Sequence, residues 1–584
     1  MRNFFKIFFA SLLACIVFTL LLFFVVVGMA SGLADSEKPT LNYNSVLVID
    51  LASEFKEQSK ENVMASFTGS DDADVIGIFD LTRLIESAKT DPKVSGIYIK
   101  CNTNNNGFAT NEAIRNALLD FKKSNKFIYA YGEMITQKSY YVAQVANKIY
   151  CNPKGMFEWK GLAATVSFFK ETLQKLEIEP QIFYAGKFKS ATEPFRETQM
   201  TEANKIQTTE LINDLFGRLV KKTSEQRKID SSILIALAND GTIISPTNAF
   251  DNKLIDGLKY DDEVKAEIIM RMGMEKNKPI EFLTISKYKK ASNSNPYSAD
   301  RIAIIYAEGD IVDGQQEDNV VASDVYRTLI AKARNDKNIK AVVLRVNSPG
   351  GSALASEVIW RELMLTKKVK PVVVSMGDVA ASGGYYISCA ADSVFAEANT
   401  ITGSIGVFGI IPNMQQFFKN KLGITFDVVK TSTYADMGSI NRPLTTNEKK
   451  IIQSEIDSVY YTFKTRVSNA RKIKLEDVEE IAQGRVWTGS RAVQIGLVDR
   501  IASLKDAVKS AATLAKISTY KIKEYPEQVG WFEKIKQSFN PKISMKTIKE
   551  QIGEEAFNTY IQIQHVKKMV GKTQMKLPFT FEIN

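Results

Sequence analysis

Two long stretches of this 584-residue chain match each other at a constant separation of 245 positions. Residues 97–102, IYIKCN, match residues 342–347, VVLRVN. The same separation aligns further identical residues: Gly132 with Gly377, Tyr140 with Tyr385, and Gly161 with Gly406. Unrelated segments would not keep one register over more than sixty positions. The chain therefore contains an internal duplication, and each copy has to fold as the same kind of unit.

Each copy alternates short apolar runs with amphipathic segments. In the second copy, residues 301–306, 341–346 and 371–375 are β-branched, apolar runs, which are typical of buried strands in a parallel sheet. Between them, residues 323–336 and 353–367 have apolar residues at helical spacing. This order predicts βαβ units, and hence an α/β fold with crossover helices.

The duplication divides the chain into segments. We expect a first repeat over residues 41–285 and a second repeat over residues 301–520. Residues 286–300, SKYKKASNSNPYSAD, are polar and predict a linker between the copies. Residues 521–584 match nothing in the first copy and are expected to form a C-terminal extension, with a helix around residues 547–570.

The N-terminus carries a long apolar run. Residues 7–30 contain no charge, and a helix of this length, at ~1.5 Å per residue, spans the ~30 Å hydrocarbon core of a bilayer. Arg2 and Lys6 precede the run, which predicts a cytoplasmic N-terminus and a body on the outer side. We expect a single transmembrane anchor. The alternative is a cleaved signal peptide, although the run exceeds the ~7–15 apolar residues typical of one.

The chain has a single histidine, His565, in the C-terminal extension. A Ser-His-Asp triad needs a histidine, and most zinc sites use several His or Cys ligands. The four cysteines show no CxxC spacing; isolated thiols are favoured, and a disulfide between Cys101 and Cys151 stays open. We expect no metal and no cofactor, and a hydrolase with this sequence would need a base other than histidine.

The net charge of +10 is spread along the chain without a long basic block. Neither a zinc-finger pattern nor an aromatic-basic pattern for single strands occurs in the sequence. We therefore expect no nucleic-acid partner.

The two copies differ at a point where a strand ends and a helix begins. The second copy has Asn-Ser-Pro-Gly-Gly at residues 347–351. The paired glycines allow a sharp turn that presents N–H groups to an anion. The first copy has Asn-Thr-Asn-Asn-Asn at residues 102–106 and has lost the pair. We therefore expect the reaction chemistry where the two copies differ.

The second copy also has a serine among small residues. Ser382 lies in DVAASGGY, residues 378–385, after an expected strand and at the start of an expected helix. A serine there is accessible to a substrate carbonyl, with the Gly383 N–H as one oxyanion donor and the Gly350–Gly351 turn as another. The same position also suits a helix N-cap. The first copy has Gln137 at the equivalent position and no nucleophile.

The first copy has a lysine that the second lacks. Lys189 lies in YAGKFKSATEPF, residues 184–195, and its equivalent in the second copy is Tyr434. Taken alone, Lys189 is typical of a solvated surface residue. The gain and the loss are reciprocal, however, since one copy keeps a serine and the other keeps a lysine. Together with the missing histidine, this reciprocity favours a serine–lysine pair.

At these motifs the chain resembles the signal peptide peptidase A family, in its long two-repeat form. Four motifs occur in the correct order: NSPGG at 347–351, AASGGY at 380–385, TGSIG at 402–406 and FKSATEPF at 188–195. The resemblance covers roughly residues 40–515 and the N-terminal run. It implies an α/β fold of two tandem Clp/crotonase-like βαβ repeats, preceded by one transmembrane helix.

The resemblance also implies roles for individual residues. Ser382 would be the nucleophile, Lys189 the general base, and Ser404 the serine whose hydroxyl orients the lysine amine. Three residues match the backbone turns of the family's oxyanion hole: Gly350, Gly351 and Gly383. The family forms a dome-like tetramer with the dyad assembled between repeats, so we expect a homotetramer. The residues alone leave open whether the dyad forms within one chain or across protomers.

A lysine base must be uncharged near neutral pH. Relative to its ordinary pKa of ~10.4, this costs ~4 kcal/mol, which desolvation or nearby cations have to supply. The residues near Lys189 in sequence provide apolar surroundings: Phe183, Ala185, Phe188 and Ala191. We expect Lys187 to be exposed. Glu193 should point away from Lys189, because pairing would favour the charged amine; a local cap before Pro194 is its expected role.

The function expected is that of a membrane-anchored serine endopeptidase. Its substrates would be peptides, in particular cleaved signal peptides left in the membrane, and its body would lie on the periplasmic side of the bacterial inner membrane. One rival is a crotonase-like acyl-CoA enzyme, but such enzymes commonly use carboxylates and have no reason to face outward. The other is a non-catalytic membrane-tethered scaffold in which the Ser382 region only binds. Covalent labelling of Ser382 by a serine probe, blocked by Lys189→Ala, would exclude both rivals.

Overall fold

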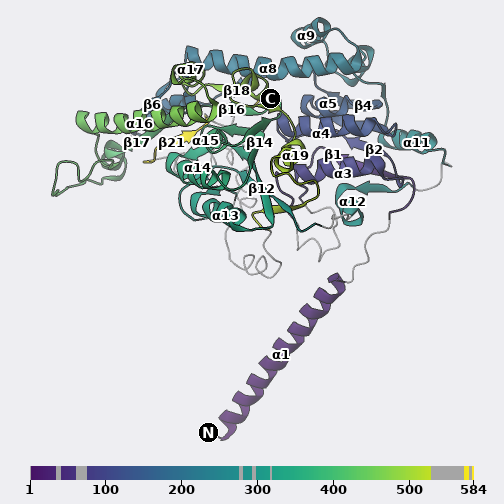
Figure 1. Ribbon diagram of the computed structural model, residues 1–584, viewed down its shortest axis with the longest axis horizontal. Coiled ribbons are helices and arrows are strands. Elements are labelled where there is room, and N and C mark those ends of the chain that lie inside the picture. The colour runs from purple at the N-terminus through teal and green to yellow at the C-terminus, as the bar shows by residue number, and fades with distance from the viewer. Residues whose placement is uncertain are drawn as a thin grey trace.

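The computed structural model describes residues 2–34, 41–60, 75–274, 280–292, 298–315, 319–527, 571–577 and 582–583. The body is an α/β assembly, and one long helix, α1 (Arg2–Ala34), stands apart from it (Figure 1). The predicted α/β class is therefore confirmed. His565 and the helix expected at residues 547–570 lie outside the described residues.

Helix α1 contains the apolar N-terminal run. Its side chains are exposed over residues 6–21, and those of residues 22–34 lie outside the description. Across the ranges that the structure describes, no helix has a stretch long and apolar enough to cross a membrane. The anchor expected at residues 7–30 extends into the part without described side chains and stays a prediction.

The first repeat is built on a six-stranded parallel sheet with the strand order β7-β4-β3-β2-β1-β8. Its strands are β1 (Ser45–Asp50), β2 (Val94–Lys100), β3 (Phe127–Ile135), β4 (Lys148–Phe157), β7 (Gly257–Leu258) and β8 (Phe282–Thr284). Its helices are α3 (Ile78–Thr90), α4 (Phe108–Lys122), α5 (Gln137–Ala143), α6 (Lys170–Lys175), η2 (Ser190–Thr192), α7 (Glu193–Arg196), α8 (Glu202–Arg227), α9 (Ser231–Asn239), α10 (Pro246–Asp251), α11 (Asp261–Arg271) and α12 (Ile285–Ala291).

The second repeat is built on a larger sheet, with the main order β18-β16-β14-β12-β9-β20; β15 also pairs with β14, and β19 pairs with β15. Its strands are β9 (Arg301–Glu308), β12 (Ile339–Ser348), β14 (Val372–Ala381), β15 (Ser393–Ala396), β16 (Ile401–Gly403), β18 (Val486–Thr488), β19 (Arg500–Ile501) and β20 (Lys521–Tyr525). Its helices are α13 (Ser323–Asn335), α14 (Ala353–Lys367), α15 (Gly383–Ser388), the π-helix η3 (Phe417–Lys421), α16 (Thr446–Arg471), α17 (Leu475–Ile481), α18 (Gly489–Gln494) and α19 (Leu504–Leu514).

Helices cover both faces of this second sheet. Along β12, Val342 and Leu344 join the core on the side of α13 and α14. Ala341 and Val343 join the core on the side of α19. Alternate residues of a strand point to opposite faces, and here both faces are buried. That is why the strands read as nearly unbroken apolar runs in the sequence.

A third sheet joins the two repeats, with the order β11-β10-β13-β21-β17-β6. Its strands are β6 (Glu179–Ala185), β10 (Ile311–Val312), β11 (Val321–Ala322), β13 (Gly350–Ser352), β17 (Val407–Asn413) and β21 (Gln574–Lys576). Strand β6 comes from the first repeat and pairs antiparallel with β17 of the second. The chain after β6, which contains Lys189, is therefore carried into the second repeat. A separate two-stranded pair joins β5 (Ala164–Thr165) to β22 (Glu582–Ile583).

The elements predicted from periodicity agree closely with the structure. Helix α14 spans the expected residues 353–367, and α13 ends one residue before the expected end at 336. All three expected strands of the second copy are present as β9, β12 and β14. The observed strands are longer than expected, because parallel pairing continues past the apolar runs that marked them.

Two of the expected segment boundaries fall inside or beside secondary structure. The segment expected as a linker, residues 286–300, begins within helix α12, where Tyr288 is fully buried. Strand β20 lies just beyond the boundary expected at residue 520 and pairs in parallel with β9. The second sheet thus includes residues that were assigned to the C-terminal extension, because β20 has no counterpart that a repeat alignment would detect.

Candidate active site

Ser382 lies at the turn between strand β14 and helix α15. Its φ of 55° and ψ of −114° lie in a region that residues with side chains rarely adopt. Such strain persists only where the surroundings hold it. Here the Ser382 N–H donates to the Gly403 carbonyl and the Ser382 carbonyl accepts from the Tyr386 N–H, both at 2.8 Å. Ser382 occupies the N-cap position of α15, but its hydroxyl makes no capping hydrogen bond to that helix.

Lys189 reaches Ser382 across the boundary between the repeats. Its Nζ lies 2.8 Å from Ser382 Oγ. It also lies 3.0 Å from Ser404 Oγ and 3.2 Å from the Ser404 carbonyl oxygen. The structure therefore brings Ser382, Lys189 and Ser404 together within one chain, a question that the residues alone left open.

The three side chains are removed from solvent. Lys189 is 1% exposed, and Ser382 and Ser404 are fully buried. Burial holds the pKa of Lys189 well below its ordinary value, because the charged amine loses its hydration. The apolar residues expected around it are buried: Phe183, Ala185, Phe188 and Ala191. The electrostatic setting thus favours an uncharged amine.

Glu193 makes its hydrogen bonds away from the lysine, as expected, but they hold Thr201, the N-cap residue of α8, and not a local cap before Pro194. Its carboxylate accepts hydrogen bonds from the Thr201 N–H at 3.2 Å and from the Thr201 hydroxyl at 2.5 Å. It also accepts one from Asn204 Nδ2 at 2.8 Å. Glu193 therefore fixes the start of α8, which follows Thr201, rather than a turn before Pro194.

Helix α8 holds the lysine segment through a residue that sequence reasoning missed. Gln207 donates from Nε2 to the Phe188 carbonyl at 3.0 Å and to Ser190 Oγ at 2.9 Å. Both partners are direct neighbours of Lys189. Gln207 is itself 1% exposed, so these bonds form without competition from water and fix the direction of the lysine side chain. No local pattern marks Gln207, because its partners lie in a different element.

The second repeat approaches the lysine from the other side. The Phe188 N–H donates to the Gln483 carbonyl at 2.8 Å. Gly484 has a φ of +78°, and a Cβ at this position would lie 2.6 Å from Lys189 Cβ. Only glycine permits this approach. The backbone at Gly484 therefore belongs to the wall that closes the lysine site.

The glycine turn faces Ser382. Gly350 and Gly351 have φ values of +96° and +156°, and a Cβ on Gly350 would lie 2.6 Å from the Gly383 nitrogen. The Gly350 N–H donates to Ser348 Oγ at 3.2 Å. Three glycines were expected to form an oxyanion hole. Gly350 shapes the turn, but its N–H already donates to Ser348 and is not free to bind an oxyanion. Gly351 and Gly383 are the better candidates for donors.

Buried contacts between the repeats keep the two halves of the site in register. Arg345 Nε donates to Glu57 Oε2 at 2.7 Å, and both side chains are at most 3% exposed. Asp378 Oδ1 accepts hydrogen bonds from the N–H groups of Ala109 and Thr110 at 2.8 and 2.9 Å. A carboxylate of the second repeat thus caps helix α4 of the first, where the helix dipole favours a negative charge.

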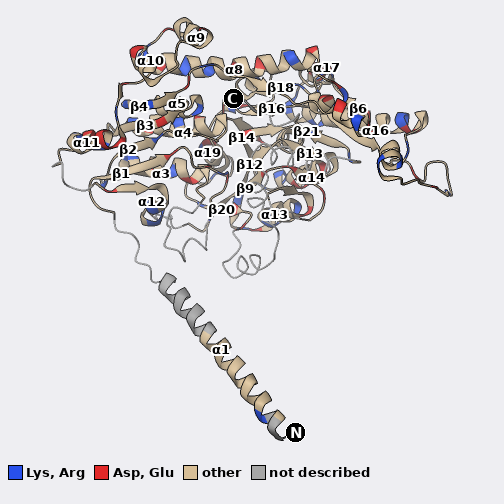
Figure 2. Ribbon diagram, turned by 180° about the vertical axis from the view of Figure 1, so that it is seen from behind, with Lys and Arg blue, Asp and Glu red and all other residues tan. Residues whose placement is uncertain are grey.

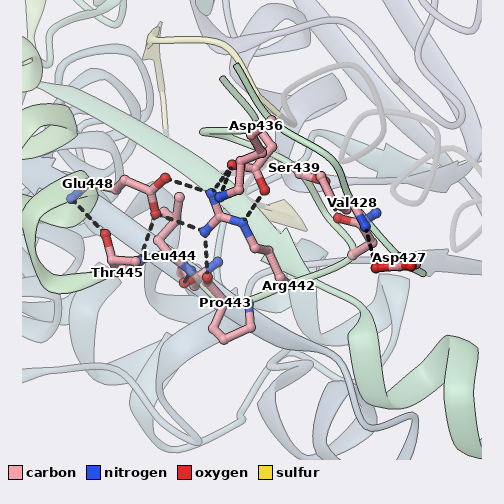
Figure 3. A network of polar contacts seen from close by, with 12 residues as sticks. Asp427, Val428, Asp436, Ser439, Arg442, Pro443, Leu444, Thr445 and Glu448 are labelled. Carbon is pink, nitrogen blue, oxygen red and sulfur yellow. Dashed lines mark hydrogen bonds and ion pairs between the residues drawn. The ribbon is translucent and has the colours of Figure 1, made fainter. Parts of the chain in front are cut away.

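The segment of the second repeat that aligns with the Lys189 loop has a structural role. Tyr434, the counterpart of Lys189, is 44% exposed. Nearby, Arg442 donates to the carboxylates of Asp436 and Glu448 at 2.7 and 2.6 Å (Figure 3). Hydrogen bonding to Arg442 lowers the pKa of Glu448 to about 2. This network ties the loop to the start of α16 and places no amine near a nucleophile.

The remaining candidate groups are the cysteines and the charged side chains. Cys101, Cys151 and Cys389 are buried free thiols, so no disulfide joins the first two. Within the described residues, no group of three or more His, Cys, Asp or Glu side chains is placed to hold a metal ion. Basic and acidic residues are interspersed over the body (Figure 2).

The fold and this site define a class of protein. A strained, buried serine at the end of a parallel strand, next to a glycine turn and against a buried amine, provides the groups that nucleophilic catalysis by a serine needs. The sequence family described as Clp protease matches residues 292–402, and Peptidase family S49 matches residues 120–274 and again residues 364–518. The two S49 matches confirm the internal repeat.

Curated relatives agree with these family matches. The chain is 33% identical to Protease 4 of Salmonella typhi over 527 residues, covering 88% of this chain and 85% of that protein. It is 33% identical to Protease 4 of Haemophilus influenzae over 513 residues, covering 85% and 82%. It is 31% identical to the chloroplastic serine protease SPPA of Arabidopsis thaliana over 481 residues, covering 81% and 69%. The chain belongs to peptidase family S49 and is a serine peptidase.

Proposed function

We propose that this protein is a membrane-anchored endopeptidase that cleaves peptides with a Ser382–Lys189 dyad. The observation that carries the proposal is the 2.8 Å separation between Ser382 Oγ and Lys189 Nζ at a buried site. A buried lysine with a lowered pKa is the base that such a serine needs. The chain's single histidine lies far from Ser382 in sequence and is not required.

The reaction would proceed by acyl transfer. Ser382 Oγ attacks the peptide carbonyl while uncharged Lys189 takes the hydroxyl proton. The tetrahedral oxyanion accepts hydrogen bonds from the Gly351 and Gly383 N–H groups, each of which is worth roughly 10²–10³ in rate for such donors. Lys189 then protonates the leaving amine, and water repeats the cycle to release the acyl group. Ser404 Oγ, 3.0 Å from Nζ, orients the amine throughout.

The proposal also includes a location at the membrane and a class of substrate. Residues 7–30 would anchor the body at the outer face of the bacterial inner membrane, as their lack of charge and the preceding Arg2 and Lys6 suggest. Apolar signal peptides left in the membrane would then be the nearest substrates. One similar protein, from Enterococcus faecium, is named a putative signal peptide peptidase. A homotetramer is the assembly that the family resemblance suggests.

A serine-directed fluorophosphonate probe tests the dyad. We expect the purified full chain to be labelled at Ser382, and the Lys189→Met variant to lose labelling while keeping its near-ultraviolet circular dichroism. Ser388→Ala is the matched control, because Ser388 is also buried but donates to the Gly384 carbonyl, away from the lysine. Retained turnover of a quenched signal-sequence peptide by Ser382→Ala would refute the assignment.

A further inference from the structure

A pocket lies between helix α8 of the first repeat and the second repeat. Helix α8 is the long helix that runs past elements of both repeats in Figure 1. The pocket has a volume of about 430 Å³, which is within the range of pockets that hold small ligands, roughly 300–1,000 Å³. Polar and charged side chains of both repeats line it, among them Asp214, Arg218 and Lys221 of α8 and Asn399, Ser490 and Arg491 of the second repeat.

The charged groups that line the pocket do not balance. Asp214 accepts hydrogen bonds from Arg491 Nε and Nη2 at 2.6 and 2.9 Å, so these two charges offset each other. Arg218 pairs with Glu112, a buried residue of α4. Lys221 is exposed and forms no ion pair with any residue that the structure describes. The lining therefore has an excess of positive charge.

The carboxylate behind the pocket serves two guanidinium groups. Glu112 pairs with Arg218 and is 1% exposed. Arg115, three residues further along α4, is 2% exposed, and its Nε and Nη2 have no hydrogen-bond partner. Burial lowers the pKa of Arg115, and the charge of Glu112 acts in the opposite direction. A buried charge without a full counterion is costly, so this cluster adds to the positive charge beside the pocket.

Neither of two other carboxyl groups nearby removes this excess. Glu225 forms an ion pair with Lys222 at 2.7 Å. Glu397 of the second repeat is 3% exposed. Burial and the charge of Glu112 raise the pKa of Glu397 to about 8, so this carboxyl is largely protonated at neutral pH. An anion from outside the chain would supply the missing negative charge.

Donors for such an anion are present in the lining. Glu112 accepts from Nε and Nη2 of Arg218, and Nη1 takes no part in that pair. Asn399 Nδ2 makes only a long contact, 3.5 Å, with Tyr141 OH. Guanidinium and ammonium groups bind phosphate oxygens through charge-assisted hydrogen bonds. Arg218, Lys221 and Asn399 together therefore suit a phosphate group.

Helix α8 connects this pocket to the segment that carries the lysine base. Gln207 holds the neighbours of Lys189, and Arg218 lies eleven residues, or about three turns, further along the same face. Between them, Glu210 and Asp214 form ion pairs with arginines of the second repeat. One row of α8 side chains thus holds the helix against its surroundings from the lysine segment to the pocket.

We propose that this pocket binds a phosphate group through Lys221, Arg218 and Asn399, and that the bound group stabilises the contact of α8 with the second repeat. The site lies apart from Ser382, so phosphate binding does not depend on the proposed peptidase function. Inorganic phosphate and the headgroup of an anionic lipid both carry the group that the pocket would recognise.

Isothermal titration calorimetry of the full-length protein with inorganic phosphate tests the site. We expect Lys221→Gln to weaken binding about tenfold or more, since a charge-assisted hydrogen bond is lost, and Lys221→Arg to keep it. Lys205→Gln is the control, because it makes the same charge change on α8 sixteen residues away, a distance of about 24 Å. Absence of phosphate binding, or equal affinity in all four proteins, would overturn the proposal.

Dihexanoylphosphatidylglycerol, titrated below its micellar concentration, distinguishes the two sources of phosphate. Binding that is tighter than that of inorganic phosphate, and that Lys221→Gln weakens, supports the site with a lipid headgroup as its occupant. Weaker binding than that of inorganic phosphate supports the site with free phosphate as its occupant.

Hydrogen exchange tests the effect on α8. In the Ser382→Ala background, where turnover plays no part, phosphate should slow amide exchange over residues 202–227 and 184–195. Lys221→Gln in the same background should abolish this protection. Exchange that phosphate leaves unchanged in both proteins would overturn the stabilising role, whether or not Ser382 and Lys189 form the catalytic dyad.

Discussion

The two repeats carry the same turn between a strand and a helix, and they use it in opposite ways. In the first repeat, the Gln137 side chain donates to the Gly161 carbonyl at 2.8 Å and accepts from the N–H groups of Lys160 and Gly161 at 3.0 Å. Thr136 caps the helix that follows. In the second repeat, Ser382 has a strained backbone and an uncapped hydroxyl facing an amine. One turn is closed by its own side chains, and the other places a hydroxyl against a buried amine.

The neighbouring loop shows the same contrast. In the first repeat, Asn106 Nδ2 donates to the carbonyls of Leu51 and Ser53, and Asn106 Oδ1 accepts from the Phe55 N–H. In the second repeat, Gly350 and Gly351 offer bare backbone, against which another strand pairs. Side-chain hydrogen bonds that satisfy a loop internally leave no backbone group to bind a peptide. The loop is thus closed by side chains in one copy and paired through its backbone in the other.

The largest expected effect is the loss of kcat when Lys189 is replaced. We expect Lys189→Met to lower kcat for a quenched peptide by about 10³-fold or more, since a positioned general base alone contributes roughly 10²–10⁴ and the nucleophile depends on it. Gln137→Ala in the closed turn should leave kcat within about twofold, because that turn lies outside the reaction path. A Gln137→Ala variant as inactive as Lys189→Met would show that the first repeat takes part directly.

Breaking the buried Arg345–Glu57 ion pair between the repeats should cause a large loss in the free energy of unfolding. Arg345→Met leaves Glu57 buried without its partner, which typically costs about 3–5 kcal/mol. The double variant Arg345→Met, Glu57→Met removes the uncompensated charge and should recover most of this loss. Urea denaturation of the two variants measures the difference. If the single variant is as stable as the double, the ion pair does not hold the repeats together.

The kcat/KM of the enzyme should fall as the pH is lowered. Because burial lowers the pKa of Lys189, the amine is neutral above that value, and kcat/KM should fall about tenfold per pH unit below it. The unfolded state binds more protons between this lowered pKa and the ordinary value, so stability should rise with pH across that window. Lys189→Met should flatten this part of the stability profile. A rate that is level from pH 5 to 9 would argue against a lysine base.

The smallest expected effect is the loss of stability when Asp378, which caps helix α4 of the first repeat, is replaced. Asp378→Ala removes the acceptor for the N–H groups of Ala109 and Thr110, which should cost about 1 kcal/mol. Asp378→Asn keeps an acceptor oxygen and should lose less. Thermal unfolding compares the three proteins. Asp230→Ala, which removes the exposed cap of α9, provides a reference for a cap within one repeat, and an equal loss there would mean that bridging the repeats adds nothing.

Much of the fold was readable from local patterns. Apolar periodicity predicted α13, α14 and the three strands beside them, because it reflects burial within a single element. It did not predict β20 or the strand exchange of β6, since both depend on pairing with distant strands. Ser382 and Lys189 were found because the copies differ there, and Ser404 was found through the family resemblance. Gln207 and Gly484 were missed, because each acts only through its position against the lysine segment.

The sequence by itself determined the duplication, the α/β class and the reciprocal presence of a serine and a lysine. Each of these is encoded locally or by comparison of one copy with the other. Only the tertiary structure decided that Lys189 loses its water, that it meets Ser382 at 2.8 Å across 193 positions, and that Met575 lies at the glycine turn. The reason is physical: desolvation and strand pairing are properties of surfaces formed when the two repeats and the C-terminal segment pack together.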